Sequence, residues 1–205
     1  MIELLVVIAI IAILAAIAYP TFIGILERAK ATKDMNNLRQ IGIATQLYMN
    51  DNDGALFSTA TSWMSQLHPK YLSSWNVFQS PLDIRPSSEL GTAATPISYG
   101  INGTANLVGT SVDKISQPTI FILFAPAQAS TPTVTFQGTA VTGTPGVTVL
   151  RATSNPGGAA IGGTHSARKK INALFADLHL ENMAWSVFTN NPPGSDPSAA
   201  QRWTP

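Results

Sequence analysis

The sequence contains no cysteine among its 205 residues. This absence excludes structural disulfides, thiolate zinc sites and cysteine nucleophiles. Charged residues are also scarce, since they make up 11% of the chain against 45% for hydrophobic residues. The 12 lysines and arginines nearly balance the 11 acidic residues. Because the chain has no overall basic field, it is not expected to bind nucleic acid.

Common enzyme motifs are absent as well. The sequence has no G-x-S-x-G elbow, no H-E-x-x-H pair and no P-loop, which are the signatures of several hydrolases, zinc proteases and nucleotide-binding enzymes. His68, His165 and His179 can in principle supply a catalytic triad with Asp and Ser residues, but no motif supports one. We therefore expect a protein that is not an enzyme and that uses no cofactor.

Three polar residues toward the C-terminal end form a weak candidate metal site. His165, Asp177 and His179 can meet if this region folds as a hairpin. The alternative is that they hold the hairpin together through hydrogen bonds. The sequence favours this second role, so no bound metal is expected.

Two other short patterns also have structural interpretations. Asp51 and Asp53 resemble part of a calcium loop, but the glutamate that completes such a loop is missing, so we interpret them as the end of a helix. Asn102-Gly103-Thr104 matches an N-glycosylation acceptor, although so short a pattern occurs often by chance.

A long apolar run occupies the N-terminal end of the chain. No charged side chain occurs from Leu4 to Leu26, and no polar side chain occurs from Leu4 to Ala18. As a helix, Leu4 to Leu26 is ~35 Å long, enough to cross a hydrocarbon core of about 30 Å. The sequence therefore predicts one membrane span, with a cluster of basic and acidic residues over 27–34 at the water interface.

A cleaved secretory signal is the competing interpretation of this run, because residues 16–18 resemble a cleavage site. Two observations oppose it. Glu3 stands where such signals carry lysine or arginine, and the helical pattern continues for about thirty residues past Pro20.

The continuation past Pro20 predicts an amphipathic helix. Apolar or small residues recur there in steps of three and four, which places Asp34 and Asn37 largely on the opposite, polar side. The helix is expected to end within residues 50–54, where poor helix formers precede Gly54.

Two residues in the apolar run are unusual. A carboxylate at Glu3 costs about 3 kcal/mol if it lies deep in lipid, so it is expected either to have a partner or to lie in the headgroup layer. Pro20 removes one backbone hydrogen bond and is expected to loosen the helix over 16–19 or to mark its boundary.

Residues 2–20, IELLVVIAIIAILAAIAYP, resemble the N-terminal helix of type IV pilins and type II secretion pseudopilins. In that family a prepilin peptidase cuts after a glycine, the new N-terminal residue is methylated, and a glutamate stands fifth in the mature chain. Glu3 stands third in this sequence. The resemblance therefore implies two further residues, Phe-Thr, in front of Met1.

The resemblance implies a structural subunit that polymerises through this helix into an extracellular, bacterial, type IV pilus-like filament of identical copies. It also implies that the precursor lies in the inner membrane, that prepilin peptidase and a pilus assembly machinery are its partners, and that the filament ends at the cell surface. The residues to which the resemblance assigns assembly are Met1, Glu3, Leu4, Val7, Ile10, Ile11, Leu14 and Pro20.

Two alternatives to a pilus subunit remain open. One is a pseudopilin of a type II secretion system, which has the same kind of helix. The other is a monomeric, membrane-anchored protein whose head binds a ligand. Glu3 favours a polymer over a plain anchor, because an anchor has no use for an acid at the start of its span, whereas a polymer can pair it between subunits.

Parts of the remaining sequence are similar to pilin-like proteins abundant in planctomycetes. Trp63 to Leu72 and Ser98 to Asn102 fit that group. Its members carry a CPSD signature, where this chain has QSPLD at 79–83. They also end in a His-x9-Asp-Gly motif, whereas here eleven residues separate His165 from Asp177-Leu178.

The residues after the helix predict a β-rich head independently of the family resemblance. Thr119 to Ala125 is a strong buried-strand run, Val134 to Gln137 and Val147 to Arg151 suggest shorter strands, and Asn172 to Ala176 with Leu178 to Met183 suggest a hairpin. Ser62 is expected to cap a short helix over Trp63 to Leu67. The Thr-rich stretch 131–148 is consistent with a loop, a β-arm or a subunit contact.

The predicted fold class is α+β, with a long N-terminal helix carrying a head built on an antiparallel sheet. We expect the helix over 1–54, with a hydrophobic part at 1–26 and an amphipathic part at 27–54. The head is expected over 55–189, and a proline-rich extended tail over 190–205.

Overall fold

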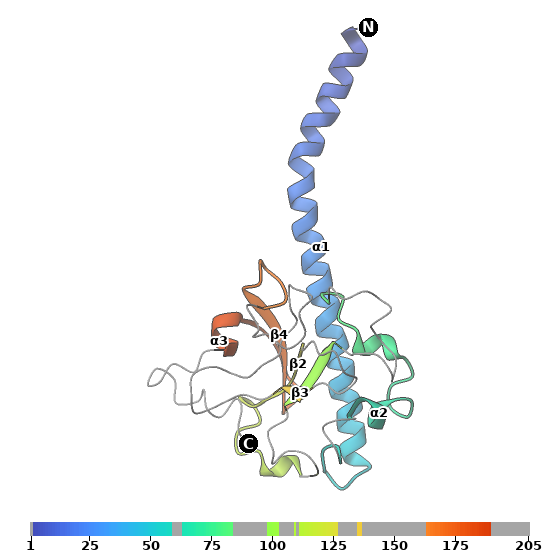
Figure 1. Cartoon of the computed structure of the whole chain (residues 1–205), viewed down its shortest axis with the longest axis vertical. Coiled ribbons are helices and arrows are strands. Elements are labelled where there is room, and N and C mark those ends of the chain that lie inside the picture. The colour runs from blue at the N-terminus through green and yellow to red at the C-terminus, as the bar shows by residue number, and fades with distance from the viewer. Residues whose placement is uncertain are drawn as a thin grey trace.

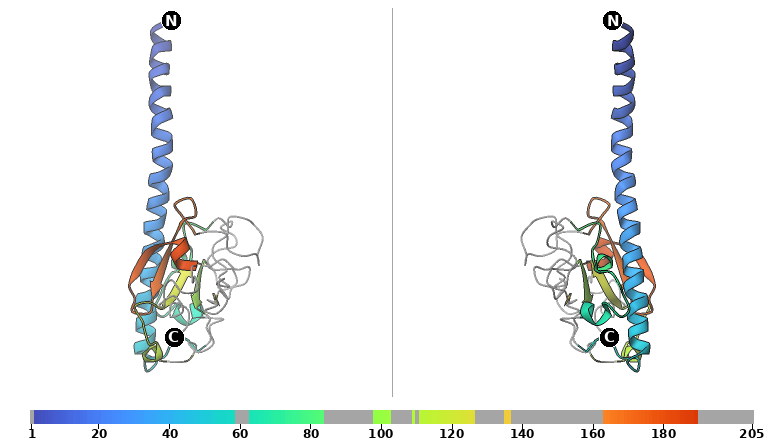
Figure 2. Two further views of the ribbon diagram at one scale, coloured as in Figure 1. Left: turned by 90° about the vertical axis from the view of Figure 1, so that its left-hand side faces the viewer. Right: turned by 90° about the vertical axis from the view of Figure 1, so that its right-hand side faces the viewer.

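A computed structural model of the chain describes residues 2–58, 63–83, 98–102, 109, 111–126, 135–136 and 163–189. A single helix, α1 (Ile2–Asn50), dominates the molecule (Figure 1). Its 49 residues correspond to a length of ~74 Å. The head folds around the C-terminal half of α1, and the N-terminal half projects away from it, as both side views in Figure 2 show. The predicted α+β class is confirmed.

The N-terminal half of α1 is a continuous exposed helix. Its most apolar stretch is not buried at all, and the helix is long and apolar enough to cross a membrane. Pro20 lies inside the helix, so the interpretation of Pro20 as a helix boundary is wrong. The carbonyl that loses its helical donor through Pro20 is that of Ala16. Beside the proline, the Thr21 hydroxyl donates to the Ala18 carbonyl oxygen at 2.7 Å, a side-chain bond to the preceding turn of the kind that often accompanies a bend in a helix.

The C-terminal half of α1 buries one side against the head. Leu38 and Ile41 are fully buried there. Gly42 permits the close approach, because a Cβ at this position would lie 3.1 Å from Leu174 Cδ2. The expectation that Asp34 and Asn37 lie on the polar side is wrong, since both are buried. Both have hydrogen-bond partners in the head, and these partners make their burial tolerable.

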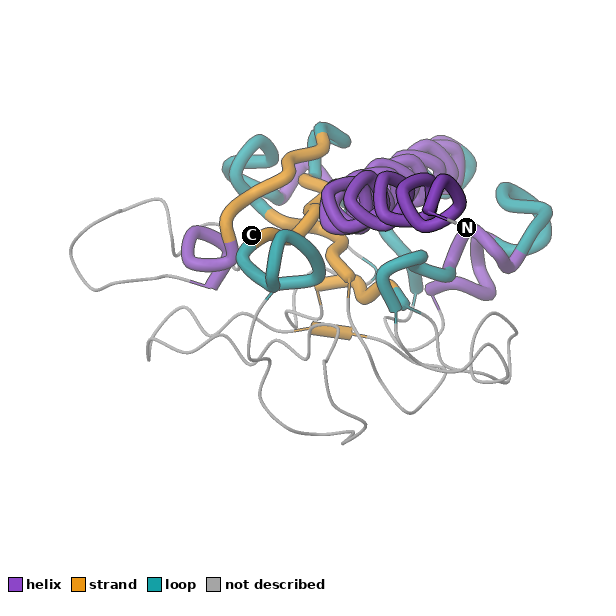
Figure 3. The backbone as a smooth tube through the Cα atoms, turned by 90° about the horizontal axis from the view of Figure 1, so that it is seen from above, coloured by secondary structure: helices purple, strands orange, loops and turns teal. Residues whose placement is uncertain are grey.

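The head contains a five-stranded sheet in the order β3-β1-β2-β4-β5. The strands are β1 (Tyr99–Asn102), β2 (Ile122–Pro126), β3 (Thr135–Phe136), β4 (Lys170–Phe175) and β5 (Leu180–Ala184). All neighbouring pairs are antiparallel except β3, which joins β1 in parallel. Seen from above, α1 lies beside the strands (Figure 3), and among the strands it packs mainly against β4.

Two apolar clusters fill the head, one on each face of the sheet. Leu174 of β4 belongs to the cluster under α1, which includes the fully buried Trp63 and Phe124. Ala173 and Phe175 point to the opposite face, where they pack with Phe188 of α3 (Trp185–Thr189). This alternation follows from the two-residue period of a strand.

Most predicted elements that fall on described residues are present. The last hairpin is confirmed as β4 and β5, the run 119–125 contains most of β2, and β3 falls inside 134–137. The short helix α2 (Trp63–Leu67) is confirmed. Ser62, the strand at 147–151 and the tail at 190–205 lie outside the described residues.

Strand β1 and the remaining short helices were not predicted from the sequence. β1 is buried at all four positions, so it shows no alternation of apolar and polar residues by which to recognise it. The described residues contain the 3-10 helices η2 (Trp75–Phe78) and η4 (Val112–Lys114), and Ser74 and Ser111 cap them through their side chains.

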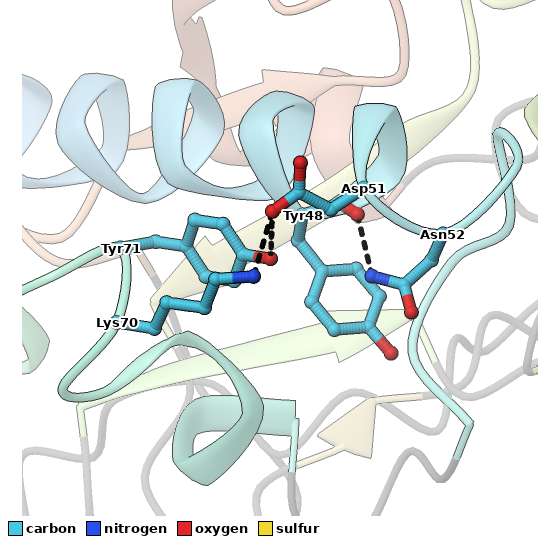
Figure 4. A network of polar contacts seen from close by, with 5 residues as sticks. All are labelled: Tyr48, Asp51, Asn52, Lys70 and Tyr71. Carbon is cyan, nitrogen blue, oxygen red and sulfur yellow. Dashed lines mark hydrogen bonds and ion pairs between the residues drawn. The ribbon is translucent and has the colours of Figure 1, made fainter.

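The end of α1 is tied to the loop that follows α2 (Figure 4). Asp51 accepts hydrogen bonds from Lys70 Nζ at 2.7 Å and from the Tyr71 hydroxyl at 2.8 Å. These bonds lower the pKa of Asp51, and its carboxylate raises that of Lys70. Asp53 and Gly54 take positive φ angles of 53° and 77°, which end the helix where the sequence predicted. Asp51 fixes this end through its side chain, and Asp53 through its backbone conformation.

Candidate assembly surface and polar network

The exposed half of α1 is the largest apolar feature of the described chain. Leu4, Val7 and Leu14 are 70%, 52% and 62% exposed. Ile10, Ile11 and Glu3 are exposed as well, whereas Met1 lies outside the described residues. The apolar residues from 4 to 18 surround the helix on every side, so no polar face is left for water. Exposed apolar surface of this extent marks contact with lipid or with protein.

A buried carboxylate lies where the exposed half of α1 meets the head. Asp34 is fully buried, and its Oδ1 accepts hydrogen bonds from the Ser80 hydroxyl and from the Tyr99 hydroxyl, the latter at 2.8 Å. Its Oδ2 accepts from Asn172 Nδ2 at 2.8 Å. Asp34 thus joins α1 to strands β1 and β4 and to the loop after η2.

The same network continues across the sheet to a histidine. Asn182 Nδ2 of β5 donates to Asn172 Oδ1 and lies 2.6 Å from His165 Nε2. Because the amide nitrogen is a donor, Nε2 accepts and the proton of the neutral ring lies on Nδ1. Thr164 Oγ1 is within 3.0 Å of that nitrogen. A chain of polar contacts therefore runs from α1 to the start of β4.

Burial shifts the ionisation of the groups in this network. Burial raises the pKa of Asp34 above its usual 3.8, even though the hydrogen bonds from Ser80, Asn172 and Tyr99 oppose the shift. Burial and the neighbouring carboxyl of Asp34 raise the pKa of Tyr99. Burial lowers the pKa of His165 below 6.5. The environment of His165 therefore favours the neutral form of its imidazole ring.

We expect His165 to make the folded protein less stable in mild acid. Its pKa is lower in the folded chain than the unfolded value of 6.5, so the unfolded state binds the proton first as the pH falls, and stability is lost below about pH 6.5. Replacing His165 by glutamine should reduce the loss of thermal stability between about pH 7.5 and about pH 5.5. His179→Gln is the matched control, and an equal loss in His165→Gln and in the wild type would contradict the assignment.

The candidate metal residues are not brought together. His165 forms a bridge with Lys170 at the start of β4, whereas Asp177 and His179 lie in the turn after β4 ends. Among the described residues no group of three His, Asp or Glu side chains is placed to hold a metal. Asp177 instead accepts from the His179 backbone NH at 3.1 Å, and the His179 ring stacks on Phe175. These contacts hold the hairpin turn.

The glycosylation pattern at Asn102 also has a structural role. Asn102 is fully buried in β1, and its Nδ2 donates to the Ile122 carbonyl oxygen at 3.1 Å. In the folded head this amide is therefore not accessible for modification.

A groove beside α1 was not found from the sequence. It has a volume of about 560 Å³ and opens where α1 leaves the head. Its helix side carries Glu27, Arg28 and Met35, and its sheet side carries His165, Lys170 and Asn182. Its two sides come from segments more than a hundred residues apart, so the sequence does not show that they meet. The clusters of charge at 28–33 and 168–170 are the only features of the sequence that could have pointed to this groove.

No protein-family model, no curated protein and no solved structure matches this chain. The described chain has a long apolar N-terminal helix followed by a small, mainly antiparallel sheet, which is a pilin-like shape. The helix is long and apolar enough to span a membrane.

Proposed function

We propose that this protein is a pilin-type structural subunit that polymerises into a helical filament through residues 2–26. The observation that carries the proposal is the division of α1 into two parts. The C-terminal part buries one side in a folded head, whereas the N-terminal part is exposed and, over residues 4–18, apolar on every side. Such a segment must be covered by lipid or by protein, and copies of the same helix are the cover that we propose in the fibre.

The proposed route to the filament begins in the inner membrane. The span Leu4 to Leu26 matches a hydrocarbon core of about 30 Å, so the precursor can wait there as a single-pass protein. Processing by a prepilin peptidase and transfer by an assembly machinery then place the segment among identical helices. Because a head-to-tail helical contact repeats without closing, one kind of subunit is sufficient for a long fibre.

A monomeric anchor is the competing function, and Glu3 argues against it. An anchor gains nothing from an exposed acid at the start of its span, and the acid costs free energy when it moves into lipid. In a filament the acid can pair with a cation of the neighbouring subunit.

Electron microscopy of fibres sheared from native cells, with mass spectrometry of their subunit, tests the proposal. We expect thin fibres in which this chain is the main component. Recovery of the chain only from membranes, as monomers or closed rings, would contradict the filament.

The backbone before Pro20 is expected to be helical in the single chain and partly unwound in the filament. The single chain is helical through Pro20, because the proline costs it only one hydrogen bond and one strained turn. In the fibre, neighbouring chains or water can donate hydrogen bonds to the freed carbonyl oxygens, so we expect loss of helical hydrogen bonds between Ala12 and Tyr19. A filament structure of the wild type and of Pro20→Ala checks this, and an unbroken wild-type helix from Met1 to Tyr48 would contradict it.

A further inference from the structure

Basic residues are concentrated where α1 leaves the head. Six of the 12 lysines and arginines of the chain fall in two short segments, 28–33 and 168–170. Five of them are exposed and one is half-buried. We call them the basic collar, and its members are Arg28, Lys30, Lys33, Arg168, Lys169 and Lys170.

A direct contact holds the two segments of the basic collar at the same level along the molecule. The Glu27 carboxylate on α1 accepts a hydrogen bond from the Ser166 backbone NH at 2.7 Å. Ser166 belongs to the loop before β4, which rises beside α1 on the side of the projecting helix (Figure 1). The loop and the helix therefore present their cations together, and the groove that Arg28 and Lys170 line lies between them.

The basic collar has more cations than there are acidic groups beside it. Glu27 also lines the groove and offsets one positive charge there, while its carboxylate accepts a hydrogen bond from the Ser166 backbone NH. Asp34 is buried behind the groove and is fully hydrogen-bonded within the head. His165 faces the groove as well, and burial favours its neutral form.

The basic collar lies at headgroup depth if residues 4–26 span a membrane. From Leu26, the last residue of the uncharged run, α1 rises ~3 Å to Arg28 and ~8 Å to Ala31, and both residues line the groove. The polar layer outside each face of the hydrocarbon core is about 5–8 Å thick. The groove therefore opens at the level of lipid phosphates rather than in bulk water.

We propose that the basic collar and its groove bind the phosphate headgroup of an anionic membrane lipid while the subunit waits in the bilayer. The inference rests on the membrane-spanning precursor of the proposed function. Arg28 and Lys170 supply the charge from the two sides of the groove, and the remaining collar cations attract further anionic lipids around the helix. Such binding fixes the depth and tilt of the head above the membrane before assembly.

The test uses the full-length chain reconstituted into phosphatidylcholine vesicles that contain spin-labelled lipid. Electron paramagnetic resonance measures how strongly labelled phosphatidylglycerol is retained beside the protein relative to labelled phosphatidylcholine. We expect the wild type to prefer phosphatidylglycerol by at least roughly threefold, and the preference to fall in high salt. The Arg28→Gln/Lys170→Gln variant should lose most of it.

Two control variants separate headgroup binding from general charge and from folding. Arg39→Gln/Lys114→Gln removes the same charge from exposed positions on α1 and η4 and should retain the preference. Arg28→Lys/Lys170→Arg keeps the charges at the groove and should retain it too. Equal preference in the wild type and in Arg28→Gln/Lys170→Gln would overturn the inference.

Two further outcomes identify other occupants of the groove. If the lipid preference is absent but the wild-type chain binds inorganic phosphate more tightly than Arg28→Gln/Lys170→Gln does, the groove takes free phosphate and the lipid assignment is wrong. If the preference is absent and the groove variant only lowers fibre yield, the basic collar is a contact between subunits. Failure of the wild-type chain to insert into vesicles at all would contradict the proposed precursor and the inference together, whereas insertion without preference contradicts the inference alone.

Discussion

Replacing Asp34 by alanine is expected to lower the free energy of unfolding of the head by ~3–5 kcal/mol. The carboxyl accepts hydrogen bonds from Ser80, Tyr99 and Asn172, all of which are buried. Alanine leaves all three donors without this acceptor, and an unsatisfied buried donor costs about 1–3 kcal/mol. Water that enters the space offsets part of the sum.

Chemical denaturation of the full chain in detergent micelles, followed by the near-UV signal of the buried aromatic residues, measures this loss. Thr45→Val is the matched control. Thr45 is also buried on α1, but its hydroxyl donates to Ile41 O of the same helix at 2.8 Å and therefore does not join the helix to the sheet through this bond. It should cost no more than about 1 kcal/mol. Asp34→Asn keeps one acceptor oxygen and should lie between the two. An Asp34→Ala variant as stable as Thr45→Val would show that the network does not hold α1 to the sheet.

Replacing Glu3 by alanine is expected to abolish filaments while leaving membrane insertion intact. If Glu3 neutralises a cation in the filament core, its removal leaves that charge buried without a partner, at a cost of about 3–5 kcal/mol for each subunit. A cost repeated at every subunit prevents a long polymer. Glu3→Gln keeps the shape without the charge and should also impair assembly.

Fibre yield after shearing, normalised to the amount of protein in the membrane, measures this effect. Glu181→Ala is the control, since it removes an equal charge from an exposed position on β5 and should leave the yield unchanged. Normal yield from Glu3→Ala would mean that Glu3 is merely solvated at the membrane surface.

The long helix and the last hairpin were predictable because local patterns determine them. The uninterrupted apolar run and the residues at 50–54 set the length of α1, and β4 and β5 are neighbours in sequence joined by a short turn. Such elements need no knowledge of distant residues.

The polar network and the groove were not predictable for the opposite reason. The local pattern predicts that Asp34 faces solvent on an amphipathic helix. Its partners Tyr99 and Asn172 lie 65 and 138 residues away in the chain, so the local pattern does not reveal them. The groove likewise depends on a contact between Glu27 and Ser166 across 139 residues. Hydrogen-bond partners, rather than hydropathy, decide whether such residues are buried.

The central claim is that residues 2–26 of successive subunits form the filament core, and spin labelling tests it directly because the chain has no cysteine of its own. A nitroxide attached to Leu14→Cys should give a sharp spectrum in micelles. In fibres, where helices pack about 8–10 Å apart, it should broaden through neighbouring labels. Dilution with unlabelled subunits should remove the broadening, and a label at Lys114→Cys on the head should broaden less. A spectrum from Leu14→Cys that stays sharp in fibres, or that does not change on dilution, would contradict the account.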